Sequence, residues 1–118
     1  MIKLKRIYEE YDEEDGYRIL VDRLWPRGIK KEEANFDLWL KDIAPSNELR
    51  IWFNHDPAKW EDFKKKYGAE LSNKKDFLNK IRRAEKENRV VTLLYGAKDS
   101  ERNQAVVIAG MLEKNVRT

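Results

Sequence analysis

The chain has 118 residues, of which 41% are hydrophobic and 40% charged, and it contains four Trp, five Tyr and four Phe. This length predicts one domain, because either half alone would bury too little surface, and a compact fold should have a radius of gyration of roughly 13 to 14 Å. The aromatic residues can supply a core, which excludes intrinsic disorder. The absence of cysteine excludes disulfides, thiolate metal sites and thiol nucleophiles, and the single histidine, His55, excludes a two-histidine metal site.

Charge and hydropathy limit the partners. The chain has 25 Lys and Arg against 22 Asp and Glu, a net charge of +3, which is too small to establish a polyanionic partner. No apolar run approaches the ~18 residues of a membrane span, and the first residues lack the apolar stretch of a signal peptide. We therefore expect a cytoplasmic protein that has no membrane partner, no metal and no cofactor.

The first part of the chain is predicted to contain two strands separated by an acidic loop. The strands are residues 2–8 and 17–22, which are rich in β-branched and aromatic side chains. The loop, residues 9–16, has six carboxylates and ends in glycine, and we expect it to be solvated rather than a cation site. The connection is too short for a parallel crossover, so the two strands are either antiparallel neighbours or not adjacent.

A third strand and three helices are expected next. Residues 30–35 are interpreted as one or two helical turns, and apolar alternation over residues 36–42 predicts a strand that ends before Pro45. The three helices are predicted from their start signals and apolar spacing, and they are residues 47–54 after the N-cap Ser46, a helix that starts at Asp56 and Pro57, and residues 73–88.

The clearest element is the apolar run of residues 90–95, which is typical of a strand covered on both faces. Gly96 ends it, and Asp99 or Ser100 is expected to cap a last helix. The fold class is therefore predicted to be α/β, a single layered domain whose small mixed or parallel sheet is flanked by helices.

Ligands of such sheets bind beyond the carboxyl ends of strands, where two loops of this chain carry unusual side chains. In the first loop, residues 22–28, two arginines can hold a carboxylate or phosphate, and Trp25 can stack on a ring. Asp22 is a candidate general base there. The alternative is structural: Asp22 pairs with Arg23 or Arg27, and Trp25 fills the core.

The second loop, residues 95–103, is a strand–turn–helix unit with a glycine at the turn and cations around a helix start, which favours an anion. The alternative is an ordinary helix start with solvated Lys98 and Arg102. His55 is a further candidate acid or base, or else a turn residue that helps to cap the next helix. The candidate ligand-binding residues are Arg23, Trp25, Arg27, Tyr95, Gly96, Lys98, Arg102 and Asn103, and the catalytic candidates are Asp22, His55 and Asp99.

Four long motifs, GYRILVDRLWPRG (16–28), DLWLKDIAPS (37–46), WFNHDP (52–57) and TLLYGAKD (92–99), resemble those of the YeaO-like proteins of domain-of-unknown-function family 488. The resemblance runs over nearly the whole chain and implies a small bacterial or archaeal cytoplasmic protein with an α/β sheet. The family has no agreed activity. Longer members tend to carry Cys in place of Tyr95 and Cys-His-Arg at positions 103–105, so the resemblance implies no thiol- or histidine-dependent role here.

Three hypotheses for the function follow, and none decides whether the protein is an enzyme. The leading one is a cleft between the two loops that takes a small anionic or phosphorylated ligand. The second is a nucleic-acid-binding module that uses basic helical faces such as residues 64–66. The third is a protein-interaction or oligomerising domain whose tryptophans form a patch.

Overall fold

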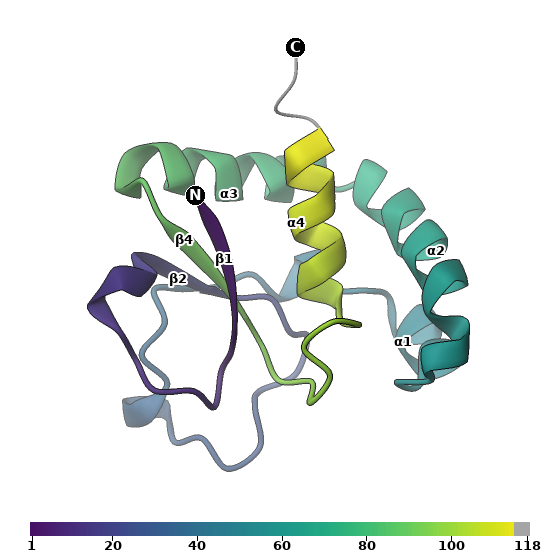
Figure 1. The fold of residues 1–118 in the computed structure, drawn as a ribbon, viewed down its shortest axis with the longest axis horizontal. Coiled ribbons are helices and arrows are strands. Elements are labelled where there is room, and N and C mark those ends of the chain that lie inside the picture. Colours follow the sequence, from purple (N-terminus) through teal and green to yellow (C-terminus); the bar gives the residue numbers. More distant parts are fainter. Residues whose placement is uncertain (115–118) are drawn as a thin grey trace.

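Four parallel strands form the sheet of the computed structural model, which describes residues 1–114, and their order is β1-β4-β2-β3. Figure 1 labels the first three of these strands. The central strand β4 (Val91–Tyr95) pairs with β1 (Ile2–Arg6) on one side and β2 (Tyr17–Leu20) on the other, and β3 (Leu38–Trp39) lies beside β2. The α/β class and the parallel sheet are therefore confirmed. Because β4 lies between β1 and β2, these two strands are not adjacent, which is one of the two arrangements predicted from their short connection.

The third strand is shorter than the predicted residues 36–42. Only Leu38 and Trp39 pair with β2, and the chain then turns into the 3-10 helix Lys41–Ile43. The side chain of Asp37 accepts the backbone N–H of Arg18 at 2.8 Å, which holds the start of the strand at the sheet edge. The helical turn expected within residues 30–35 is the 3-10 helix Lys31–Glu33.

The helices lie to one side of the sheet, above and to the right of it in Figure 1. They are α1 (Asn47–Phe53), α2 (Trp60–Ser72, preceded by the 3-10 helix Pro57–Lys59), α3 (Lys75–Asn88) and α4 (Gln104–Lys114). Ser46 caps α1 as predicted, because its hydroxyl accepts the N–H of Leu49. None of the helices within residues 1–114 has both the length and the apolar character that crossing a bilayer requires.

The last helix starts later than predicted. Asp99 accepts the backbone N–H groups of Glu101 and Arg102 and so closes a turn before the helix. The cap of α4 is Asn103, whose Oδ1 accepts the N–H of Val106 at 3.1 Å. The expected cap at Asp99 or Ser100 is therefore wrong, because the loop uses Asp99 for its own turn.

Successive residues of β4 point to opposite faces of the sheet and are all buried, as the apolar run predicted. On one face, Val91, Leu93 and Tyr95 join the core formed with the helices. On the other face, Leu94 packs with Leu20 and Ile7, and the cover comes from Ile29 and Phe36 of the long connection before β3 and from Trp39 of β3 itself. The Cα radius of gyration is 13.7 Å, within the predicted range.

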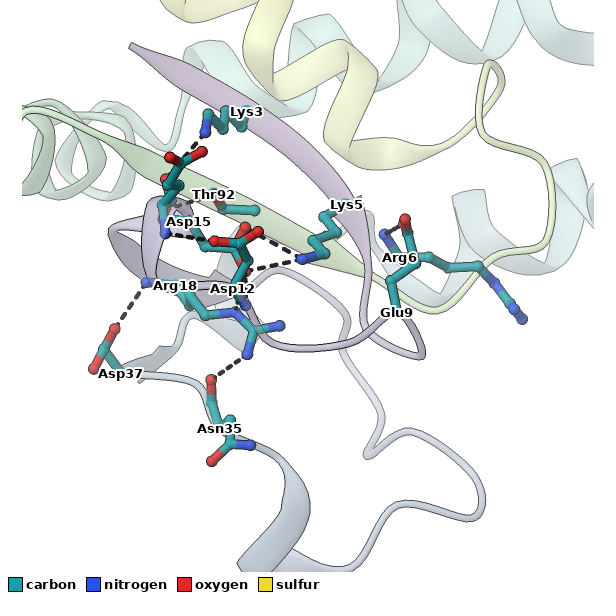
Figure 2. A network of polar contacts seen from close by, with 11 residues as sticks. Lys3, Lys5, Arg6, Glu9, Asp12, Asp15, Arg18, Asn35, Asp37 and Thr92 are labelled. Atoms are coloured by element: carbon teal, nitrogen blue, oxygen red, sulfur yellow. Dashed lines mark hydrogen bonds and ion pairs between the residues drawn. The ribbon is translucent and has the colours of Figure 1, made fainter.

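A cluster of buried charges extends this second face (Figure 2). Asp15, which is 5% exposed, accepts a hydrogen bond from Lys5 at 3.1 Å and lies 3.3 Å from Nε of Arg18. Its backbone carbonyl accepts the hydroxyl of Thr92 at 2.7 Å, and Arg18 Nη1 donates to the carbonyl of Asn35. We expected the acidic loop to be solvated, but its last carboxylate is buried, because it neutralises two cations on the sheet.

Asp15→Ala should destabilise the protein strongly. The substitution leaves Arg18, which is 2% exposed, without its counter-charge, so we expect the free energy of unfolding to fall by about 3 to 5 kcal/mol in urea denaturation. The matched control is Glu13→Ala, because the exposed Glu13 side chain in the same loop forms no hydrogen bond or ion pair within residues 1–114. The control should change stability by less than about 0.5 kcal/mol. Equal losses in the two variants would contradict a structural role for the cluster.

Candidate functional site

The two loops singled out by sequence meet at the carboxyl ends of β2 and β4, which are neighbours in the sheet. Together with α1 they line a cleft of about 610 Å³. The predicted residues that line it are Asp22, Arg23, Trp25, Arg27, His55, Gly96, Arg102 and Asn103. The parallel sheet therefore brings most of the predicted residues together at one place.

Asp22 connects the two loops. Its carboxylate accepts the backbone N–H of Gly96 at 2.8 Å and a hydrogen bond from the side-chain amide of Gln104, the first residue of α4. A Cβ atom at position 96 would lie 2.8 Å from this carboxylate, so a larger residue there would displace the Asp22 side chain. Burial raises the pKa of Asp22 to about 6, while these two hydrogen bonds act in the opposite direction.

The alternative in which Asp22 pairs with an arginine is not observed. Arg23 instead donates to two backbone carbonyls, those of Ala44 at 3.1 Å and Pro45 at 3.2 Å. It thereby fixes the end of β2 against the segment that leads into α1. Arg23 is a positioning residue in this arrangement, because at least two of its N–H groups are used within the fold.

Trp25 forms a fixed, partly exposed wall of the cleft. Its indole N–H donates to the carbonyl of Ile29 at 2.7 Å, and its ring lies 5.5 Å from that of Trp39 and 5.7 Å from that of Phe36. Since 37% of Trp25 remains exposed, the residue does not simply fill the core. The aromatic neighbours hold the ring in place from within the second face of the sheet.

The charged lining is mostly positive. Among the described residues, the cleft is lined by four arginines, Arg23, Arg27, Arg50 and Arg102, and by a single carboxylate, Asp22. The guanidinium groups of Arg27 and Arg50 form no hydrogen bond, ion pair or ring contact within residues 1–114. Arg102 forms a partly exposed ion pair with Asp99 at 3.2 Å. Such an excess of guanidinium groups at one concave surface favours an anion.

Three predicted residues, Tyr95, Lys98 and Asp99, are not among those that line the cleft. Tyr95 is 4% exposed and belongs to the core under the helices, and burial raises the pKa of its hydroxyl. Lys98 is exposed, and Asp99 closes the turn before α4. The hydrogen bonds from Glu101 and Arg102 hold the pKa of Asp99 below its usual value. A binding or catalytic role for these three residues stays a prediction.

His55 and Asn103 both line the cleft, but only Asn103 is held by side-chain hydrogen bonds within residues 1–114. His55 is exposed, and both His55 and the preceding Asn54 have a left-handed backbone conformation, with φ of 55° and 44° respectively. The cap of the following 3-10 helix is Asp56, which accepts the N–H of Ala58. The amide of Asn103 is committed to the loop, because it donates to the carbonyl of Asp99 and accepts from Val106.

The lining residues that were not chosen from the sequence include Leu24, Arg50, Ile51 and Gln104. Leu49 and Phe53 of α1 face the core, whereas Arg50 and Ile51 are exposed. The apolar spacing of α1 could have revealed this, because an isoleucine next to an arginine falls outside the core-facing positions. Gln104 is one residue beyond the predicted second loop.

No group of three or more His, Asp or Glu side chains suited to a metal ion occurs within the part of the chain that the structure describes.

Comparisons with known proteins identify the family. A family model described as "Inactive DUF488-N3 subclade" matches residues 1–118. The uncharacterized protein YeaO of Escherichia coli is 43% identical over 111 residues, which cover 94% of this chain and 96% of YeaO. The chain belongs to the DUF488 family. Uncharacterized proteins of Mycobacterium tuberculosis and Mycobacterium bovis are 38% identical over 94% of this chain and 92% of their own. No solved structure matches the chain.

The DUF488 chain should lose stability as Asp22 ionises. Its pKa of about 6 in the fold exceeds the ordinary value of 3.8, so between these values the folded state holds a proton that the unfolded chain releases. The stabilisation is present below the lower value and lost as the pH rises through 6. Relative to Asp22→Asn, the wild type should lose about 2 kcal/mol of unfolding free energy from pH 4 to pH 7. Urea denaturation measures this, and parallel pH profiles would contradict it.

Proposed function

We propose that this DUF488 protein binds a small organic anion, a phosphate or a carboxylate, in the cleft between the two strand-end loops. The observation that carries the proposal is the charge of the cleft, in which four arginines face one aspartate. Two of them, Arg27 and Arg50, have guanidinium groups that form no hydrogen bond or ion pair within residues 1–114. A guanidinium group binds carboxylate or phosphate oxygens through two parallel N–H groups.

The rest of the cleft supplies a frame for such an anion. Asp22 and Arg23 direct their polar atoms at backbone groups and the side chain of Gln104, which fixes the loops without using Arg27 or Arg50. A preformed frame lowers the conformational cost of binding, because the loops are ordered before the ligand arrives.

Binding without a covalent step is the form of this proposal that the comparisons support. The matching family model is described as inactive, and the chain contains no cysteine. The described lining of the cleft also includes no serine or threonine that could act as a nucleophile. Of the three candidates for acid–base chemistry, Asp22, His55 and Asp99, the first two line the cleft and would be the nearest to a bound anion that reacts.

Substituting the uncommitted arginines tests the proposal. Arg27→Ala and Arg50→Ala should each weaken the binding of inorganic phosphate about tenfold in calorimetric titration at low salt, since each removes a charge-assisted hydrogen-bond donor. The control is Arg83→Ala, which removes an exposed arginine of α3 whose side chain also forms no hydrogen bond or ion pair within residues 1–114. All three variants should unfold like the wild type. The proposal fails if phosphate does not bind, or if the control loses as much affinity as the cleft variants.

The nucleic-acid hypothesis stays a prediction, and the contacts of the tryptophans favour the cleft over it. Lys59 and Lys66 lie over the ring of Trp52 at 5.2 and 5.0 Å, and Lys64 lies 5.8 Å from the ring of Trp60. Bases would compete with these lysines for the same ring faces. A titration with short single-stranded DNA at several salt concentrations tests the hypothesis directly. The hypothesis of an interaction or oligomerising domain stays a prediction as well.

A further inference from the structure

The cleft has an exposed apolar part beside its arginines. Leu24, Trp25 and Ile51 are 61%, 37% and 68% exposed, and all three line the cleft. Large apolar side chains scattered singly over a surface need no explanation, but several that share one concavity indicate a binding site. They come from different parts of the chain, the loop after β2 and helix α1, so the fold rather than the local sequence brings them to the same cleft.

Trp25 is suited to hold a flat, apolar group. Its hydrogen bond to Ile29 and its packing against Phe36 and Trp39 fix the ring before any ligand binds. A ring held in this way loses little conformational freedom when a second ring packs on it. Most of the ordering that such a contact requires is therefore already present in the fold.

The same two segments supply both apolar and cationic side chains to the cleft. Trp25 and Arg27 come from the loop after β2, and Arg50 and Ile51 come from α1. A ligand held by these arginines would therefore share the cleft with the apolar side chains. The cleft volume of about 610 Å³ is far larger than one phosphate group fills, and it falls in the range of sites that enclose a whole small molecule.

We infer that the cleft takes an amphipathic anion, in which a phosphate or carboxylate group is joined to a planar apolar body that packs against Trp25, Leu24 and Ile51. This inference rests on the proposed function and adds the class of ligand. Charge complementarity places the anionic group at Arg27 and Arg50, and the exposed apolar side chains account for the remaining volume.

A matched pair of phosphate monoesters tests the ligand class. Methyl phosphate and 1-naphthyl phosphate carry the same anionic group and differ in the apolar body. In calorimetric titration we expect 1-naphthyl phosphate to bind about tenfold more tightly or better, because its ring buries apolar surface that the methyl group cannot. Neutral 1-naphthol should bind much more weakly than its phosphate, because it lacks the group that the arginines hold.

Variants assign this difference to particular side chains. Leu24→Ser and Ile51→Ser should reduce the affinity for 1-naphthyl phosphate several-fold and leave methyl phosphate unchanged, and both side chains are exposed enough that folding should be unaffected. Arg50→Ala should weaken the binding of both esters. Leu4→Ser, a substitution of an exposed apolar residue of β1 that does not line the cleft, should change neither affinity.

The outcomes separate the two proposals. If both esters bind equally well, or if Leu24→Ser and Ile51→Ser leave the preference intact, the inference of an apolar body is overturned while the anion site stands. If 1-naphthol binds as tightly as 1-naphthyl phosphate, the inference also fails, because the anionic group then contributes nothing. If neither ester binds, the proposed function fails, and the inference fails with it.

Discussion

The carboxylate of Asp22 joins three segments that are distant in sequence: the end of β2, the loop after β4 and the start of α4. The same loop is held from the other side by Arg6 of β1, whose guanidinium group donates to the carbonyls of Gly96 and Ala97 at 3.3 and 3.0 Å. Because β4 lies between β1 and β2, side chains from both neighbouring strands reach its carboxyl end. The strand order thus fixes the loop at the cleft, and it does so through backbone groups that any residue in the loop would supply. The side chain matters at position 96, since a Cβ there would lie 2.8 Å from the carboxylate of Asp22 and would displace it.

The second face of the sheet, on which Leu20 and Leu94 lie, determines how the loop after β2 is positioned at the cleft. No helix of three turns or more within residues 1–114 covers that face, so the connections before β2 and β3 must do so. Phe36 and Trp39 pack there and support Trp25 at the edge of the cleft. Arg18 ties the connection to the sheet through the carbonyl of Asn35, which has a left-handed φ of 46°. The buried charges around Asp15 in Figure 2 therefore belong to the same layer that places the tryptophan, although they lie outside the cleft.

The sequence could place the two loops of the candidate cleft side by side because its signals were local. A buried strand is a continuous apolar run, and in a parallel sheet the carboxyl ends of the strands share one edge, so the loops after β2 and β4 could be placed together without knowing their contacts. The contacts themselves depend on tertiary structure. Gln104 reaches Asp22 across 82 positions, and the carbonyls that hold Arg23 belong to a segment whose direction is set by packing. The third strand was predicted too long for the same reason: where it ends depends on tertiary structure. The apolar alternation over residues 36–42 continues after pairing with β2 has ended.

The polar side chains of the cleft fall into two classes that differ in what a ligand could gain from them. Asp22, Arg23 and Asn103 already have hydrogen-bond partners within the fold, and removing one would leave buried backbone groups unsatisfied. Arg27 and Arg50 have no such partners in residues 1–114, so a ligand can bind them without breaking an existing contact. Stability and affinity should therefore depend on different residues of one cleft. Substitutions in the first class act on the frame, and only those in the second class report on the ligand itself.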